Sequence, residues 1–581
     1  MKPTGAAPFS SSRPPEGNLL LQGAMAVLGF AGAAALCFIP TVQRSLAVLW
    51  FYQGSYYLML LLAAAWALAV WTVLREERPD IRGFLKENTA GVVLSILMTM
   101  IVFLSAHSQF RLLSDETNLL AVSKSMLYDK HTANVTQGKW FHFNFYAEEY
   151  QPEKRPFLYP LCIYFCHVLL GFRDWNPFLV NALALAGMLF LVFVFLRRRL
   201  GIACAAAGMI LVIAQPVVTQ TAASAGMDMM AAFCMAAALM SLGWFLEKPG
   251  ASRFLLVWFQ LLLLAHTRYE GPLYFAVIVA ALAWKGLIRL SYFRSSWLYT
   301  LTPLFFVVTY WQRVLMPTDL QTPEGVAPFG LSYFVRHNMD FFKTFFRFDF
   351  LLPYAPIVNF LGLLCLAAGA FRLFSRPLPS RTARIWAFTA AAMLGTYWVV
   401  VNAHFGGFAL MYDGVRLMVP AVVVLSVACA WGMARLRGFH KRPFFLVAAA
   451  LTAFLIYHPM SIENRGWNAV ILTREYRFVS GFLEKQPSRN FLVVAYRSGI
   501  YTARDWGAVS VQYANLHKKE LLAEKKQHLY RDIFVIQEID LASGQPVADT
   551  VLDPEYRLEP LLESQRQMPG VTKTRISKVI N

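Results

Sequence analysis

The sequence predicts an all-α polytopic membrane protein that ends in a small α/β domain. Hydrophobic residues make up 57% of the 581 residues and charged residues only 15%, which leaves too little polar surface for a soluble protein of this length. Apolar stretches of helical length alternate with short basic loops along most of the chain. From about residue 463 the chain becomes charged, and no further stretch of this kind follows.

The apolar stretches predict about 13 transmembrane helices, because a bilayer core of about 30 Å needs about 20 apolar residues for each crossing. Basic loops such as residues 75–86 mark the cytoplasmic side and place the N-terminus inside. The expected spans are residues 19–40, 46–74, 89–106, 176–196, 201–222, 228–246, 254–267, 271–288, 297–316, 351–372, 385–402, 416–434 and 443–459.

The first long external loop, residues 107–155, precedes an apolar segment that does not fit as a span. Residues 156–171 are short and contain two prolines near their start. Only one crossing fits between an external loop and the basic cluster at residues 197–199, and residues 176–196 supply it. We therefore expect juxtamembrane or re-entrant helices next to this external loop.

Composition divides the chain into four parts. The last part combines a helical run with two strand-like runs, which predicts an α/β domain on the external side. The expected parts are residues 1–18, a disordered cytoplasmic tail; 19–88, two N-terminal transmembrane helices; 89–462, the transmembrane core; and 463–581, the external α/β domain.

The net charge of +19 does not indicate nucleic-acid binding, because the basic residues lie in short loops between apolar segments. Positive-inside topology and contact with anionic lipid headgroups explain this distribution. All seven cysteines lie in apolar segments, without a His or carboxylate at metal-ligand spacing, and we interpret them as small hydrophobic residues. The sequence therefore predicts no required cofactor; a divalent metal is possible but not indicated.

The residues Ser114-Asp115-Glu116-Thr117 follow an apolar helix and begin an amphipathic run just outside the membrane. Two interpretations are open for the adjacent carboxylates. They stabilise the N-terminal end of a helix with Ser114 as its N-cap, or Asp115 is a general base that deprotonates an acceptor hydroxyl. Asp228, at the external start of another apolar helix, allows the same two interpretations, and an acid in this position is a functional candidate.

Basic residues on the external side run against the positive-inside bias. Each of them either extends to lipid phosphates or holds the phosphate of a lipid-linked donor. His404 is a weaker candidate, and His266 lies in an apolar run that favours a packing role. The external basic candidates are Lys154, Arg155, Arg268 and Arg416.

Five short motifs, in order along residues 107–420, resemble those of the GT-C superfamily of integral-membrane glycosyltransferases. The resemblance is closest to the branch of the lipid A aminoarabinose transferases and protein O-mannosyltransferases, in which an Asp-Glu pair opens the first large external loop. The external α/β domain is also similar to that of the aminoarabinose transferases. The matching residues are Asp115-Glu116, Glu153-Lys154-Arg155-Pro156, Asp228, Thr267-Arg268-Tyr269-Glu270-Gly271 and Arg416-Leu417-Met418-Val419-Pro420.

The resemblance implies inverting transfer of a sugar from a polyprenyl-phosphate donor, such as an undecaprenyl phosphate, at the external face. Asp115 would activate the acceptor hydroxyl, with Glu116 beside it, and Asp228 would orient it. The donor phosphate would be held by Lys154 or Arg155, Arg268 and Arg416. Tyr159, Glu270, His404 and Tyr412 are further candidates for substrate binding.

This chain departs from the family pattern in four respects, one of which is that Arg155 rather than Lys154 stands directly before the proline. Two helices precede the usual first core helix, Arg268 stands where the family has Lys, and Glu270 adds a carboxylate beside it. Absence of a dinucleotide-binding glycine fingerprint or a Walker loop agrees with a donor that carries no nucleotide.

Three other functions are open for a membrane protein of this composition. A secondary transporter predicts charges near mid-membrane and two similar halves, neither of which is evident. A polysaccharide polymerase or ligase would depend on external Arg and His without requiring Asp115, and an assembly scaffold would use the tail as a binding module. The preferred expectation is a transferase of the bacterial inner membrane with a periplasmic site. Its acceptor is a lipid or glycan of the cell envelope, such as lipid A or lipopolysaccharide, although a protein Ser or Thr is also open.

Overall fold

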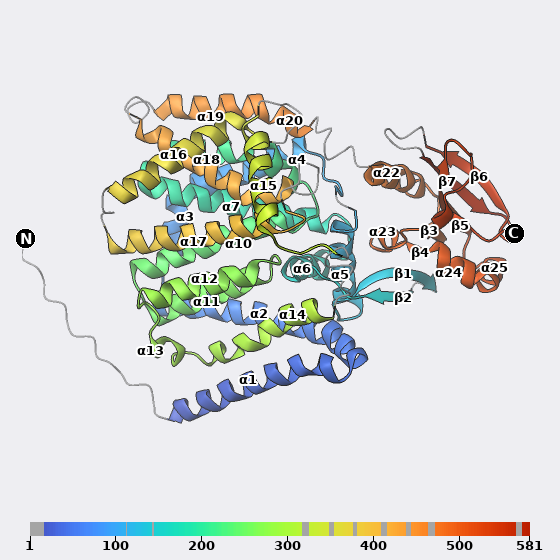
Figure 1. Ribbon diagram of the computed structural model, residues 1–581, viewed down its shortest axis with the longest axis horizontal. Coiled ribbons are helices and arrows are strands. Elements are labelled where there is room, and N and C mark those ends of the chain that lie inside the picture. Colours follow the sequence, from blue (N-terminus) through green and yellow to red (C-terminus); the bar gives the residue numbers. More distant parts are fainter. Residues whose placement is uncertain are drawn as a thin grey trace, which may run out of the picture.

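The protein consists of a bundle of apolar helices with a sheet-containing C-terminal domain at one end (Figure 1). The short elements α5 (Glu116–Tyr128) and α6 (Leu158–Leu170) lie at that end of the bundle, next to the domain. The computed structural model describes residues 17–111, 113–141, 144–315, 325–347, 354–375, 380–407, 415–436, 443–462, 471–564 and 572–581.

The first helix lies along one edge of the bundle (Figure 1). Helix α1 (Gly17–Val42) packs against α14 (Thr302–Val314) and the preceding turn η1 (Trp297–Leu301). Gly29 permits this approach, because a Cβ atom there would lie 2.4 Å from the backbone oxygen of Thr300. The second helix, α2 (Arg44–Glu77), packs against both α14 and α11 (Ala251–Ala265), so it belongs to the bundle rather than to a detached anchor.

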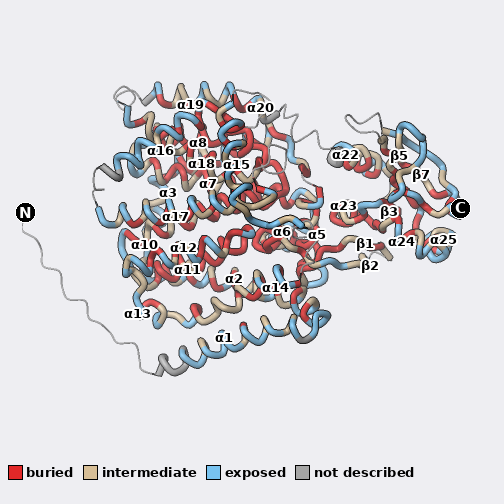
Figure 2. Tube along the Cα trace, in the orientation of Figure 1, coloured by how far each residue is buried: buried red, intermediate tan, exposed pale blue. Residues whose placement is uncertain are grey.

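The middle of the bundle is formed by helices that are buried on several sides (Figure 2). Helix α7 contacts α4, α8 and α10, and α8 contacts α18 and α19. The helices of the bundle not yet named are α3 (Ile81–Glu87), α4 (Thr89–Ser105), α7 (Asn176–Leu200), α8 (Ile202–Ile213), α9 (Pro216–Ala222), α10 (Asp228–Glu247), α12 (Gly271–Trp284), α13 (Leu290–Phe293), α15 (Leu331–Phe345), α16 (Pro356–Ser375), α17 (Arg381–Ala403), η2 (Val415–Met418), α18 (Val419–Arg435), α19 (Pro443–Tyr457) and α20 (Pro459–Ile462).

The apolar helices agree with a polytopic membrane protein, although they do not confirm a count of thirteen crossings. Six described helices are long and apolar enough to span a bilayer, or up to eight if each of two bent helix pairs is one span. The bends are 63° between α3 and α4 and 75° between α8 and α9, the latter inside the expected span 201–222. Five shorter apolar helices, including α6, accompany them.

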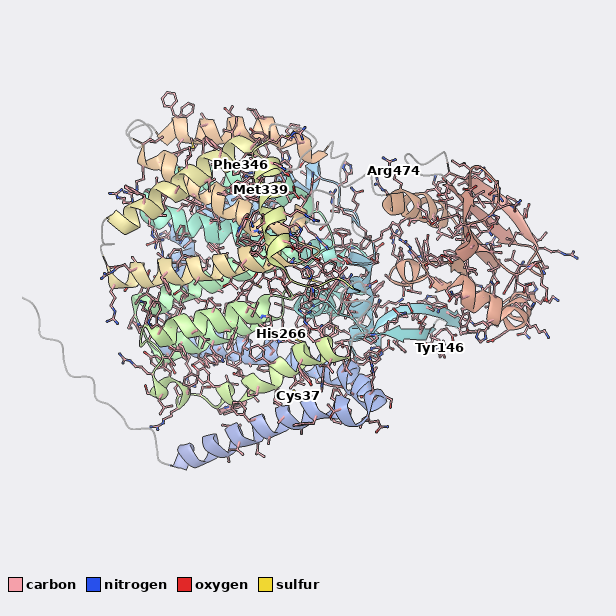
Figure 3. The ribbon with its side chains drawn as sticks, viewed as in Figure 1. Cys37, Tyr146, His266, Met339, Phe346 and Arg474 are labelled. Carbon is pink, nitrogen blue, oxygen red and sulfur yellow. The ribbon has the colours of Figure 1, made fainter. Side chains whose placement is uncertain are left out.

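Large apolar side chains are exposed on the outer helices, as expected where a helix faces lipid. Leu104 is 80% exposed on α4, and Phe371 is 74% exposed on α16. In Figure 3, Cys37 lies on the peripheral α1 and His266 lies within the bundle, where it is buried. All seven cysteines are free thiols, and His266 packs in the interior as its apolar neighbours suggest.

The C-terminal domain is built on a sheet of seven strands in the order β2-β1-β4-β3-β5-β7-β6. The neighbouring strands β4, β3 and β5 are parallel, whereas the outer pairs are antiparallel. Strands and helices here are β3 (Phe491–Ala495), β4 (Gly507–Val509), β5 (Asp532–Asp540), β6 (Leu558–Glu563), β7 (Thr572–Val579), α22 (Ile471–Leu483), α23 (Gly499–Thr502), α24 (Val511–Leu516), α25 (Lys518–Lys526) and η3 (Ala548–Thr550).

Two strands of this sheet come from the first external loop. The hairpin of β1 (Asn134–Phe141) and β2 (Asn144–Gln151) joins the domain through antiparallel pairing of Gly138 with Ala508. Figure 3 shows Tyr146 on β2 and Arg474 on α22 near the junction of bundle and domain. The sheet therefore connects the chain near Asp115 with the C-terminal domain.

Candidate active site

Asp115 stands at the start of α5 but does not cap it. The side chain makes no capping hydrogen bond with the helix, although Asp115 occupies the N-cap position. Its predecessor Ser114 has a φ of 74°, a left-handed conformation that is uncommon outside glycine, and its backbone N–H donates to the hydroxyl of Thr117 at 3.1 Å. The backbone thus turns sharply before the helix, and the Asp115 carboxylate is directed elsewhere.

Both oxygens of the Asp115 carboxylate are paired with arginine. Oδ1 accepts a hydrogen bond from the guanidinium of Arg155, and Oδ2 accepts one from Arg416. Burial alone would raise the pKa of Asp115, but the charges of Arg416 and Arg155 outweigh it and hold the pKa below its usual range. Asp115 is therefore ionised, and residues far apart in the chain meet at it.

Asp228, the first residue of α10, belongs to the same network. Oδ1 of Asp228 accepts a hydrogen bond from Arg268, and Oδ2 lies 3.5 Å from Nε of Arg416. The other side of the Arg268 guanidinium donates to Glu270 at 2.6 Å. Asp228 and Glu270 are 2% and 5% exposed, so the pairing compensates charges that would be costly to bury alone.

The segment before α6 contributes two cations with different surroundings. Arg155 is buried, and its NH1 group donates to the Glu153 carboxylate at 2.7 Å while the other end of the guanidinium meets Asp115. Lys154 instead lines a small pocket together with Arg268 and Arg313. Burial and the neighbouring Arg155 hold the pKa of Lys154 below its usual range, which an anion in the pocket would reverse.

The sequence did not single out all residues of this pocket. Arg313 lies in the last turn of α14, and the amide of Gln312 donates to the Arg155 carbonyl at 2.7 Å. Arg313 lies near the external end of the expected span 297–316, so its charge at this end is the signal that could have identified it. The lining residues are Lys154, Pro156, Ala265, Arg268, Tyr269, Thr309, Gln312 and Arg313.

Glu116 connects α5 to the loop before α10. Its Oε2 accepts hydrogen bonds from the backbone N–H groups of Arg111 at 2.9 Å and Ala225 at 3.1 Å. A methyl group at Gly226 would lie 3.5 Å from Asp228 Oδ2 and 3.8 Å from Glu116 Oε1, so both carboxyl groups face the same small space. Burial raises the pKa of Glu116 to about 7, although the two backbone donors oppose this.

This pKa predicts a pH-dependent stability. The folded state keeps a proton on Glu116 between the ordinary value near 4.5 and about 7, whereas the unfolded state has lost it. The free energy of unfolding therefore falls as pH rises through this window, by up to about 3 kcal/mol. We expect the thermal midpoint of the wild type to fall from pH 5 to pH 8, and that of Glu116→Gln to fall much less.

The exposed Glu559 supplies the matched control for this prediction. Glu559→Gln should leave the pH dependence of the wild type unchanged. If the thermal midpoint of Glu116→Gln falls with pH as much as that of the wild type, Glu116 is already ionised in the folded protein.

The further substrate-binding candidates lie in different surroundings. Tyr159 is buried, and its hydroxyl donates to the Pro177 carbonyl at 3.0 Å, which places it in the packing around the site. Glu270 pairs with Arg268. His404 follows α17 and its ring packs on Phe329, and the charges of Arg313 and Glu270 act on its imidazole. Tyr412 lies outside the described residues.

A Ser-His-Asn arrangement beneath α5 is structural rather than nucleophilic. The amide nitrogen of Asn176 lies 2.7 Å from Nδ1 of His167 and is also bound to the Gly171 carbonyl. Because Nδ1 accepts a hydrogen bond, Nε2 carries the ring proton and donates to the Ser123 hydroxyl 3.1 Å away. The ring cannot take a proton from Ser123 in this arrangement.

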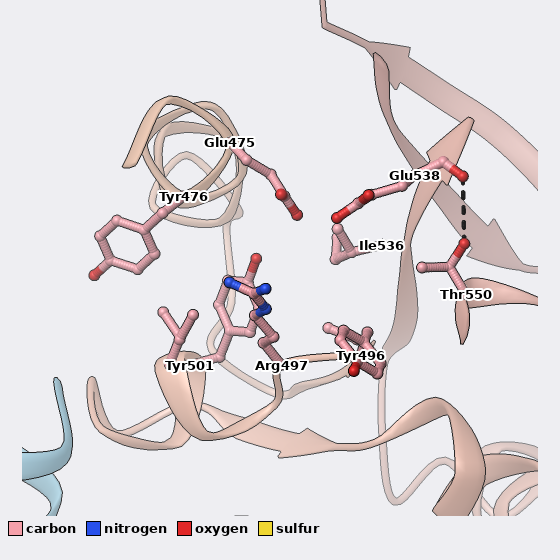
Figure 4. A pocket seen from close by; sticks show the side chains of 10 residues that line it. Glu475, Tyr476, Tyr496, Arg497, Tyr501, Ile536, Glu538 and Thr550 are labelled. Carbon is pink, nitrogen blue, oxygen red and sulfur yellow. Dashed lines mark hydrogen bonds between the residues drawn. The ribbon is translucent and has the colours of Figure 1, made fainter. Parts of the chain in front are cut away.

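A separate pocket lies in the C-terminal domain, at the carboxyl ends of the parallel strands β3 and β5 (Figure 4). The carboxyl groups of Glu475 and Glu538 approach each other there, beside Arg497. Burial and the Glu538 charge raise the pKa of Glu475 to about 7. None of the residues selected from the sequence lines this pocket.

Known proteins resemble this chain in its fold and not in its sequence. No family model and no curated protein matches the sequence. The structure is similar to ArnT from Cupriavidus metallidurans in the apo state, with 13% identity and a TM-score of 0.50 over 84% of this chain and 98% of that chain. A structure of ArnT bound to undecaprenyl phosphate aligns over the same shares, with 12% identity and a TM-score of 0.49. The likeness to the apo structure shows that this chain has an ArnT-like fold.

Proposed function

We propose that this protein is a glycosyltransferase that moves a sugar from a polyprenyl-phosphate donor to a hydroxyl or phosphate of a cell-envelope acceptor. The proposal depends chiefly on one observation: the Asp115 carboxylate lies in an arginine network whose member Arg268 also lines a pocket with Lys154 and Arg313. Such a pocket suits a phosphate, and the adjacent carboxylate suits a hydroxyl that must lose a proton.

The residues support a single displacement at the anomeric carbon when the acceptor is a hydroxyl. The acceptor oxygen forms the new bond to this carbon, its proton passes to Asp115, and the bond to the phosphate oxygen breaks. Lys154, Arg268 and Arg313 would stabilise the charge left on the departing polyprenyl phosphate. The two products are polyprenyl phosphate and the glycosylated acceptor. Together they contain all the atoms of the two substrates.

The paired state of Asp115 suggests how binding and chemistry are connected. Arg155 and Arg416 both hold its carboxylate here, which lowers its pKa and makes it a weak base. A donor phosphate nearby would compete for these guanidinium groups and so raise the basicity of Asp115. We therefore propose that donor binding precedes activation of the acceptor, on the periplasmic side of a bacterial inner membrane.

Transfer of labelled sugar from polyprenyl-phosphate donors by the purified protein tests this function. In wild type we expect label to move to lipid or glycan acceptors, and undecaprenyl phosphate to inhibit the transfer. Lys154→Met and Arg313→Met should each weaken undecaprenyl phosphate binding by about tenfold, as expected for loss of a charged hydrogen bond. Lys519→Met, which alters an exposed lysine of α25, is the matched control.

Wild-type binding of undecaprenyl phosphate without any sugar transfer would favour a transporter or a polymerase over a transferase. Equal binding by the two variants and the control would place the phosphate outside the pocket next to Lys154.

A further inference from the structure

Helix α5, which begins next to Asp115, is enclosed rather than lying on the membrane surface. The residues from Glu116 to Met126 are buried except for Asn118, including the polar residues of the face expected to meet water. Helix α6 and strand β1 pack against α5, and α23 of the C-terminal domain contacts it directly. The C-terminal domain therefore helps to bury the helix that carries the candidate base.

A buried charge connects α5 to this domain. Nζ of Lys124 lies 2.8 Å from Oδ1 of Asp505 and donates to the Thr502 carbonyl at 3.1 Å. The Lys124 side chain is 3% exposed, and its ammonium lies 3.6 Å from the centroid of the Phe145 ring. Burying such a pair gives little net stability, because desolvation offsets the attraction, so its main effect is to define geometry.

The partner of Lys124 is itself held in place. Asp505 has a φ of 68°, in the left-handed region, and its carbonyl accepts a hydrogen bond from the Trp140 indole at 3.0 Å. The hydroxyl of Thr502 donates to the Val135 carbonyl at 3.0 Å. Hairpin β1–β2 and the turn after α23 therefore form one framework around the Lys124 ammonium.

Displacement of Lys124 would reach Asp115 through the helix itself. The two residues are nine positions apart in the sequence, which corresponds to about 13 Å along a helix axis. At its other end α5 begins with the left-handed Ser114 and an N-cap whose side chain makes no hydrogen bond to the helix. Because Asp505 and Thr502 of the C-terminal domain bind Lys124, they limit sliding and rotation of α5.

We propose that Lys124 and Asp505 are positioning residues that make the C-terminal domain part of the catalytic unit. Their ion pair fixes α5 so that the Asp115 carboxylate faces the acceptor. This role rests on the proposed transferase function. The phosphate pocket is built by α14, the α11–α12 turn and the segment before α6, so the pair acts on turnover rather than on donor binding.

Steady-state kinetics of full-length Asp505→Asn tests the proposal. Asn keeps the shape of the side chain and removes the charge that holds Lys124. We expect kcat to fall by about 10-fold to 100-fold, as for a small misplacement of a catalytic group, while KM for the donor stays within about twofold. Lys124→Met should behave alike, and the double variant should lose no more than the worse single variant.

Lys518→Met is the matched control, because it removes an ion pair with Asp553 and Glu555 in the same domain, away from α5. It should keep wild-type kcat. An unchanged kcat in Asp505→Asn, or a rise in donor KM with kcat retained, would overturn the positioning role. If Asp505→Asn does not fold, Lys124→Gln is judged by the same split between kcat and KM.

Hydrogen exchange separates failure of this proposal from failure of the proposed function. If the wild type transfers no sugar, the proposed transferase function is wrong. The rate of hydrogen exchange at the amides of residues 116–121 then tests whether the C-terminal domain holds α5 in place. Faster exchange there in Asp505→Asn than in the wild type and Lys518→Met would support the hold of the domain on α5. Equal exchange in all three proteins would overturn it.

Discussion

Replacing Asp115 by Asn should reduce kcat by about 100-fold to 10,000-fold, the range expected when a general base is removed. Asn cannot accept the proton of the acceptor hydroxyl, yet it keeps the size of the side chain. The change also removes the negative charge that both Arg155 and Arg416 hold in the ligand-free protein. We therefore expect the affinity for undecaprenyl phosphate to be retained or slightly increased, because the phosphate no longer competes with a carboxylate.

This combination of lost turnover and retained binding distinguishes a base from a residue that merely supports the fold. Kinetics with saturating donor and direct binding of undecaprenyl phosphate measure the two effects separately. Glu559→Gln is the control, because Glu559 is exposed in the C-terminal domain. Wild-type kcat in Asp115→Asn would assign the proton transfer to another group and would favour a polymerase or ligase.

Local sequence signals were sufficient for the parts of the site that depend on charge and hydropathy. An acid that follows an apolar helix and begins an amphipathic run identified Asp115. An acid at the external start of an apolar helix identified Asp228, and a basic residue between two apolar helices identified Arg268. The structure brings these residues into one network with Arg416. The structure was needed to exclude side-chain capping by Asp115, because the sequence does not give the direction of its carboxylate.

Long-range pairing explains much of what the sequence left open. Residues 134–151 form a hairpin that joins a strand at residues 507–509, and such register depends on partners hundreds of positions away. The burial of Lys124 also depends on residues distant in the sequence. In the sequence alone, Lys124 looks like part of the polar face of an amphipathic helix. Its covering surface comes from the C-terminal domain.

Helix ends and bends were predicted less well than helix existence. The expected span 297–316 is divided into η1 and α14, and α15 lies between the expected spans 297–316 and 351–372. The bend between α8 and α9 lies at Gln215-Pro216, where proline removes a backbone donor. The two strand-like runs expected in the last part of the chain, residues 491–496 and 532–536, correspond to β3 and β5. Strands β6 and β7, in contrast, depend on pairing with each other and, for β7, with β5.

Replacing Arg268 by Met should affect both folding and donor binding. Arg268 is the shared partner of Asp228 and Glu270, and all three side chains are buried. Met fills a similar volume but leaves two carboxylates near each other, with Arg416 at 3.5 Å from Asp228 as a remaining cation. Breaking a buried pair on one side costs about 3–5 kcal/mol, so we expect a clearly lower thermal midpoint and a reduced yield.

A second substitution separates the two effects of Arg268. The double variant Arg268→Met with Glu270→Gln removes one of the stranded carboxylates and should recover part of the thermal midpoint. It should not recover affinity for undecaprenyl phosphate, because the cation of the pocket is still missing. Recovery of both properties would show that Arg268 only neutralises Glu270, and normal binding in the single variant would remove Arg268 from the phosphate site. Stability regained without binding would show that the same guanidinium neutralises the buried acids and holds the phosphate.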